Sequence, residues 1–130
     1  MTRTKKQLET ILLAKAVKKF RKTNLEKIET RTIDNKQYKS EEYSIELAGF
    51  KFKLYMSKDL SKNKEDGHLW ILDPKGYVFE SFELSNKNYE PTLREMYSNI
   101  KNRILKYEEK QNRKQEKDFN RQLKRLDRIL

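Results

Sequence analysis

The final segment of the chain, residues 92–130, contains neither glycine nor proline, and its apolar residues recur at helical spacing. A continuous helix of that length would span about 60 Å, because each residue adds 1.5 Å. The roughly 90 residues that precede it can form a domain with a radius of gyration of only about 12 Å. The helix is therefore too long to lie wholly on its own domain, and part of it must project or fold back.

The predicted helix carries two apolar stripes that point in different directions on a helical wheel. The first stripe, which we expect to pack on the domain, consists of Leu93, Tyr97, Ile100, Ile104 and Tyr107. The second is rotated from it by about 90° and consists of Phe119, Leu123, Leu126 and Leu130. An apolar stripe beyond the domain needs a cover, so we predict that these residues bind a target, a second copy or the N-terminal helix.

Basic residues occupy a third side of the same helix. We call this row the basic ridge, and its members are Arg103, Lys106, Lys110, Arg113, Lys114, Lys117, Arg121, Lys124, Arg125 and Arg128. The acidic residues Glu109, Glu116 and Asp127 lie on a separate line of the wheel, and Asp118 lies just outside the ridge. An ordinary solvated helix mixes the two signs to form pairs one turn apart, so this segregation favours a function for the ridge.

A straight row of like charges is stabilised by a negative partner, and a phosphate backbone is a partner of matching shape. We therefore predict a non-catalytic, nucleic-acid-binding protein that contacts DNA or RNA through the ridge. An alternative is an inhibitor or adaptor from a phage or mobile element. Such a protein, in the manner of anti-CRISPR proteins, would block the nucleic-acid or guide-RNA site of a host ribonucleoprotein complex. A helix that lies on an acidic protein, or one that simply tolerates its charge, would have the same charge pattern.

The net charge of +11 is concentrated at the two ends of the chain. Residues 1–23 carry eight basic residues and one acidic residue, whereas residues 24–90 carry eleven and thirteen. The N-terminal segment predicts a helix that begins with a capping box between Thr4 and Gln7. Its apolar face would consist of Leu8, Ile11, Leu12, Leu13, Ala16, Val17 and Phe20. On its other side, we expect four residues to assist nucleic-acid binding: Lys15, Lys18, Arg21 and Lys22.

Residues 43–56 show the alternation of an antiparallel hairpin rather than of one continuous strand. A two-residue turn at Ala48 and Gly49 keeps the apolar side chains in phase and sets Leu47 opposite Phe50. The hairpin then has one apolar and one polar face.

A second hairpin is predicted in residues 68–84, around the turn sequence DPKG. The expected register sets Leu72 opposite Val78 and Ile71 opposite Phe79. Both faces of this hairpin are apolar, which is typical of a central position in a sheet that is covered on both sides. The alternative is that one of the two faces is a partner surface.

The remaining segments complete an α+β fold. Residues 26–33 alternate weakly and predict a further strand, whereas residues 35–42 and 57–67 predict polar loops. We expect an N-terminal helix, an antiparallel sheet of about five strands with two hairpins, and a long C-terminal helix. Residues 1–107 would form the domain, and residues 108–130 a basic helical extension.

The composition limits the other possibilities. The chain has no cysteine, which excludes disulfides and thiol nucleophiles, and its longest apolar run is interrupted by Lys15. We therefore expect a cytoplasmic protein without a membrane span. No pattern predicts a metal site or a cofactor.

Histidine chemistry could come only from His68, the single histidine of the chain. A small ribonuclease toxin that used His68 and Tyr77 beside a basic residue is the catalytic alternative. Lys51, Lys53 and Tyr55 would share one sheet face and resemble a stacking platform for single strands, although an ordinary amphipathic strand has the same pattern.

Overall fold

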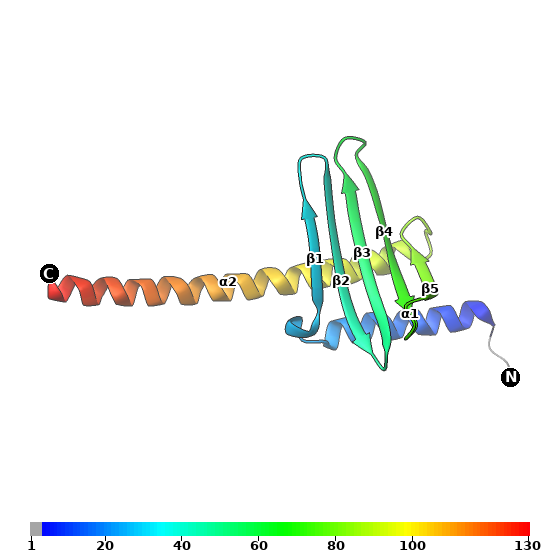
Figure 1. Cartoon of the computed structure of the whole chain (residues 1–130), viewed down its shortest axis with the longest axis horizontal. Coiled ribbons are helices and arrows are strands. Elements are labelled where there is room, and N and C mark those ends of the chain that lie inside the picture. Colours follow the sequence, from blue (N-terminus) through cyan, green and yellow to red (C-terminus); the bar gives the residue numbers. More distant parts are fainter. Residues whose placement is uncertain (1–3) are drawn as a thin grey trace.

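The computed structural model describes residues 4–130 and has an α+β fold (Figure 1). Its elements, in chain order, are α1 (Lys5–Lys22), the short 3-10 helix η1 (Leu25–Lys27), β1 (Glu29–Asp34), β2 (Tyr38–Leu47), β3 (Phe50–Asp59), β4 (Lys64–Leu72), β5 (Val78–Glu83) and α2 (Glu90–Ile129). The five strands form one antiparallel sheet in the order β1-β2-β3-β4-β5. The predicted fold class, with one helix at each end of the chain, is confirmed.

Both helices cover the same face of the sheet, and the core lies between them and that face (Figure 1). The sheet contributes alternate residues of β2, β3 and β4 together with Phe82 of β5, and each helix contributes one buried stripe. The most deeply buried large side chains are Phe20, Tyr43, Leu54, Leu69, Ile71, Phe82, Leu93 and Ile100. Burial of such side chains contributes about 1.5–3 kcal/mol each, which makes this single layer the main source of stability.

The first hairpin has the predicted register. Leu47 pairs with Phe50 across the turn, and the alternation continues along β2 and β3. Ala48 and Gly49 both have positive φ angles, 51° and 84°, which is the geometry of the two-residue turn that suits twisted strands.

The second hairpin differs from the prediction in register and in position. Leu72 pairs with Val78 as expected, but a bulge follows and Ile71 pairs with Glu80 instead of Phe79. The extra residue turns Phe82 onto the core face opposite Leu69, where it is fully buried. The prediction of a central, doubly covered hairpin is wrong, because β5 is an edge strand and both helices lie on one face of the sheet.

The predicted polar loops are largely strand. β3 continues to Asp59 and β4 begins at Lys64, so only the short turn between them is loop; β2 likewise begins at Tyr38. Figure 1 shows these strand ends extending past the helices. A strand that no helix covers has no buried face and therefore lacks the apolar alternation by which strands are predicted.

Helix α1 begins as predicted. Thr4 is the N-cap, its side chain accepts a hydrogen bond from the Gln7 backbone, and the Gln7 side chain accepts one in return. Leu13, Ala16 and Phe20 are its buried residues.

Helix α2 packs on the domain only along its first third. Leu93, Met96 and Ile100 are buried there. Beyond Ile104, this same side of the helix becomes exposed. The predicted docking of Tyr107 is wrong, because 55 % of its surface is exposed. The rest of α2 continues as one helix away from the sheet (Figure 1).

Candidate nucleic-acid interface

The basic ridge lies on the part of α2 that projects from the domain. From Lys106 to Arg128, all of its side chains are exposed. Among the described residues, the contact of 4.0 Å between Arg121 Nη1 and Asp118 Oδ1 is the one ion pair that involves the ridge. Both partners of this pair are more than two-thirds exposed, so it contributes little. The ridge therefore presents cations whose charge the protein itself leaves nearly uncompensated.

Arg103, the first member of the ridge, has a different role. Its guanidinium donates hydrogen bonds to the carbonyl oxygens of Phe20, at 2.8 Å, and Thr23, at 2.5 Å. These carbonyls belong to the C-terminal end of α1, where the helix leaves backbone acceptors without partners and where a positive charge is favoured. Arg103 thus joins α2 to the end of α1, and the freely accessible ridge begins at Lys106.

The start of the ridge faces the segment that follows α1. A shallow pocket of about 440 Å³ separates η1 from α2, and its lining includes Leu25, Glu26, Lys106, Tyr107 and Lys110. A second shallow depression of about 450 Å³ lies farther along the helix and is lined by Asp118, Arg121, Gln122, Lys124, Arg125 and Arg128. Both depressions are open, so they offer cationic side chains along a surface rather than an enclosed binding site.

The four basic residues predicted on α1 do not act as one group. Arg21 pairs with Glu95 of α2 at 2.5 Å, which holds the two helices together. Lys15, Lys18 and Lys22 instead line a groove of about 510 Å³ between α1 and the β2–β3 hairpin. The floor of this groove is apolar and is formed by Leu12, Leu47 and Phe52, with Lys19 as a fourth cation. The groove lined by these lysines therefore lies beside the β2–β3 hairpin, whereas the ridge lies beyond the end of α1.

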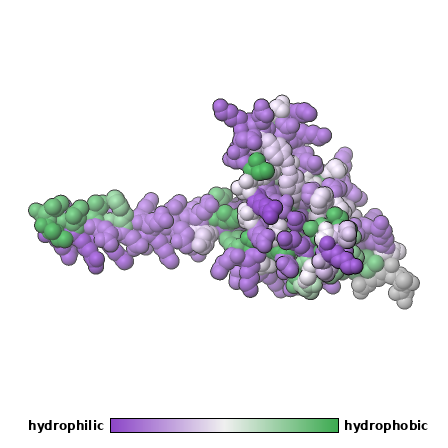
Figure 2. Space-filling model, in the orientation of Figure 1, coloured by the Kyte–Doolittle hydropathy of each residue, from purple (hydrophilic) through white to green (hydrophobic). Residues whose placement is uncertain are grey.

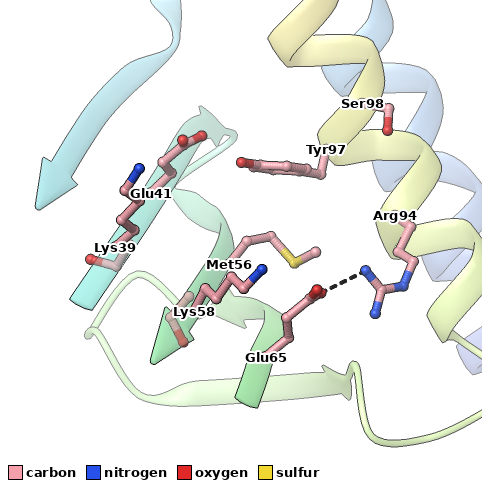
Figure 3. A pocket seen from close by; sticks show the side chains of 10 residues that line it. Lys39, Glu41, Met56, Lys58, Glu65, Arg94, Tyr97 and Ser98 are labelled. Carbon is pink, nitrogen blue, oxygen red and sulfur yellow. Dashed lines mark hydrogen bonds and ion pairs between the residues drawn. The ribbon is translucent and has the colours of Figure 1, made fainter. Parts of the chain in front are cut away.

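A third cleft, of about 400 Å³, lies between the sheet and α2 (Figure 3). Glu65 of β4 and Arg94 of α2 form a 2.8 Å ion pair across it. On the β2 side, Glu41 Oε2 accepts a hydrogen bond of 2.5 Å from the Tyr43 hydroxyl, and Glu41 Oε1 accepts one of 2.9 Å from Lys101. Sequence reasoning missed this cluster, because its members come from three separate elements and follow no local motif.

The cleft holds paired charges rather than reactive ones. Burial raises the pKa of Glu41, but hydrogen bonds from Tyr43, Lys101 and Tyr97 outweigh it, and the pKa lies below its usual value. Burial and the contact with Glu41 raise the pKa of the Tyr97 hydroxyl well above its usual range. Glu41 is therefore ionised and Tyr97 protonated at neutral pH, and the cluster ties the sheet to α2.

The uncovered face of the sheet carries a row of stacked rings. His68 lies between Tyr55, with ring centroids 5.0 Å apart, and Trp70, at 4.1 Å. Burial lowers the pKa of His68, although nearby carboxylates, chiefly that of Glu83, oppose the shift. The imidazole is consequently neutral at pH 7 and is enclosed by the two aromatic side chains.

The predicted stacking platform is electrostatically different from a phosphate-binding surface. Lys51, Lys53 and Tyr55 do share a face, but β3 lies at the centre of the sheet rather than at an edge. Lys53 pairs with Glu42 at 3.6 Å, and Lys51 pairs with Glu29 at 3.8 Å. The lysines of this face are therefore already matched by carboxylates.

The two side chains of the ribonuclease alternative are far apart. His68 lies within β4, whereas Tyr77 lies in the turn that follows, where its backbone oxygen accepts a hydrogen bond from Asp73. Five residues of extended strand separate His68 from Asp73, which corresponds to about 16 Å. The backbones of the two residues therefore lie at different ends of the second hairpin.

The predicted partner-binding stripe is exposed at the far end of α2. The exposed fractions are 63 % for Phe119, 47 % for Leu123, 51 % for Leu126 and 92 % for Leu130. Figure 2 shows apolar residues along one side of this end of the helix and polar residues along the other. The stripe and the ridge are thus opposite sides of the same projecting helix.

Comparison of the chain with protein-family models, with curated proteins and with solved structures finds no match. Within residues 4–130, no helix combines the length and the apolarity that a membrane crossing needs. In the same part of the chain, His, Asp and Glu side chains form no cluster of three that could hold a metal ion. A proposal about function therefore depends on the charge and geometry of the chain itself.

Proposed function

We propose that this protein is a cytoplasmic, non-catalytic nucleic-acid-binding protein that lays the basic ridge of α2 along a sugar-phosphate backbone. The observation that carries the proposal is the exposure of the ridge from Lys106 to Arg128 with a single weak ion pair along it. Cations one turn apart repel one another, and among the described residues the carboxylates of α2 form only this one weak ion pair with the ridge. Phosphates would relieve it, and the release of their counterions would drive binding.

The dimensions of the ridge fit this role. The stretch from Lys106 to Arg128 is about 33 Å long at 1.5 Å per residue. Because α2 projects past the sheet, a nucleic acid can approach this stretch without contact with the domain (Figure 1). Lysine and arginine contacts to phosphates position a nucleic acid but carry little sequence information. The proposed binding is therefore strong at low salt and insensitive to sequence.

The domain has the supporting role of holding the ridge in place. Arg103 and the Arg21–Glu95 pair connect α2 to α1 immediately before the ridge begins. Together with the buried Leu93, Met96 and Ile100, these contacts hold the start of α2 on the domain. In contrast, the cleft beside Glu41 and the ring stack around His68 are engaged chiefly in contacts within the domain.

The test compares two variants of equal net charge. One neutralises the ridge with Arg121→Gln, Lys124→Gln and Arg128→Gln. The control neutralises three exposed lysines outside the ridge, with Lys36→Gln, Lys62→Gln and Lys75→Gln. Binding to fluorescently labelled single-stranded and duplex DNA and RNA is measured by anisotropy over a range of salt concentrations.

We expect the affinity of the wild type to fall steeply with salt, with a slope near −0.9 per phosphate contacted on duplex DNA. The ridge variant should bind at least about tenfold more weakly and lose about one unit of slope for each contact removed, whereas the control should keep the wild-type slope. Equal losses in the two variants would mean that only net charge matters, and a flat salt dependence would refute the proposal. Retention of an acidic protein that nuclease does not release would instead favour the inhibitor or adaptor.

A further inference from the structure

The end of α2 carries the apolar stripe on one side and the basic ridge on the opposite side. Leu126 is 51 % exposed and Leu130 is 92 % exposed, and no element of the described chain packs over them. The neighbouring Ile129 is 80 % exposed. This is a large amount of apolar surface for twelve residues of a chain that is otherwise so polar.

The stripe has the spacing of a coiled-coil seam. Phe119 and Leu126 occupy position d of a heptad, and Leu123 and Leu130 occupy position a. In the same frame, positions e and g are held by Asn120, Asp127, Gln122 and Ile129. None of these four residues is basic.

Every basic residue of this region lies at a position that points away from the seam. Lys117 and Lys124 occupy position b, Arg125 occupies position c, and Arg121 and Arg128 occupy position f. Like charges across a helix pair are destabilising when they lie at positions e and g, but positions b, c and f face solvent in a two-stranded coil. A second basic helix can therefore pack on this stripe without bringing cations into the interface.

We propose that the stripe of Phe119, Leu123, Leu126 and Leu130 pairs with the same stripe of a second copy of this chain. A second copy provides a seam of the same spacing, and the charges beside the seam allow the pairing, since positions e and g contain uncharged residues and one carboxylate that a like helix tolerates. The ridge remains exposed on the outside of both helices. The inference uses only the seam positions and does not depend on the proposed binding of nucleic acid.

The pairing is short and reversible. Glu116 occupies the preceding position a, where a carboxylate ends the apolar seam. Two heptads bury less surface than the 1,200–2,000 Å² or so that is typical of stable complexes, so the dimer forms at micromolar or higher concentrations.

The experiment is analytical ultracentrifugation of the full chain after nuclease treatment and ion exchange, from about 10 µM to about 1 mM. Salt of about 0.3 M screens the repulsion between the two positively charged copies. The expected result is a mass that rises with concentration from 15.8 kDa toward twice that value. The variant Leu123→Gln/Leu126→Gln should remain at the monomer mass throughout the same range.

Leu105→Gln is the matched control for the loss of a leucine. Leu105 lies on the same helix and is 52 % exposed, almost the same as Leu126, but it lies outside the stripe. This variant should dimerise like the wild type, and circular dichroism should show that all three proteins keep their helix content. Glutamine preserves helix propensity, so loss of the dimer would reflect the seam rather than unfolding. A wild type that stays monomeric at 1 mM, or a dimer that persists in the double variant, would overturn the inference.

Discussion

Individual residues of this protein have roles that differ from those suggested by their chemical class. Arg103 continues the periodicity of the basic ridge, yet its guanidinium is committed to two backbone carbonyls at the end of α1. His68 has the side chain expected of a catalyst, yet it is stacked between Tyr55 and Trp70. A sequence pattern indicates which side chains share a direction, whereas the contacts of each one depend on elements far away in the chain.

The role of Arg103 can be tested through stability. Arg103→Gln removes charge-assisted hydrogen bonds to Phe20 and Thr23, and we expect the free energy of unfolding to fall by about 1.5–3 kcal/mol. Arg113→Gln, an exposed position of the same helix, should change it by no more than about 0.5 kcal/mol. Urea denaturation followed by circular dichroism measures both values. Equal effects of the two substitutions would show that Arg103 does not support α1.

The burial of His68 predicts a specific pH dependence. Its native pKa lies below the usual value of 6.5, so as the pH falls through 6.5 the unfolded chain binds a proton that the native protein resists. The free energy of unfolding should therefore decrease between about pH 7.5 and about pH 5.5. Glu41, with a pKa below 4.5, contributes stability that is present above 4.5 and lost only at lower pH.

His68→Phe keeps a stacking ring and removes the titrating group. Urea denaturation at the two pH values should show a smaller loss of stability for this variant than for the wild type. Since His68 is the only histidine, an unchanged difference would assign the pH dependence to another cause.

At the scale of the element, the two long helices were predictable, although α2 begins at Glu90 rather than at residue 92 and η1 overlaps the segment 26–33 that predicts a strand. The covered parts of the strands and the exposed β1 were also predictable, whereas the uncovered ends of β2, β3 and β4 were not. The capping box at Thr4 and the turn at Ala48 and Gly49 are local features, and both appear as expected. The strand ends beyond the helices have no apolar alternation, so their sequence predicts loops. The bulge beside Ile71 changed which residues of β5 face the core, and a turn motif alone does not specify such a bulge.

The candidate interface was predictable only in part. Segregation of charge on α2 identified the ridge, because a helix converts sequence spacing into direction without help from the rest of the chain. The separate positions of Arg21 and Lys15 could not be predicted, since they depend on how α1 lies against α2 and the hairpin. The cluster at Glu41 joins residues of three elements, so no local sequence pattern predicts it.

The whole molecule has two parts, a domain with a sheet covered by helices on one face and a helix that extends beyond it (Figure 1). Removal of residues 113–130 should leave the core intact, because α2 buries no side chain on the domain after Ile104. We expect the unfolding free energy to change by about 0.5 kcal/mol or less, whereas nucleic-acid affinity should fall by at least about tenfold. Thermal denaturation and anisotropy provide the two measurements. A large loss of stability would mean that the extension packs on the domain.

The sequence alone determined the helices, the turns and the side of α2 on which each kind of residue lies, because these follow from short-range spacing. Only the tertiary structure decided that both helices share one face of the sheet, that the hairpin of residues 68–84 has an uncovered side, and that α2 projects rather than folds back. Those outcomes depend on which apolar surfaces meet, and a chain of few apolar residues can cover only one face of its sheet. The apolar stripe at the end of α2 is where we infer that a second copy binds.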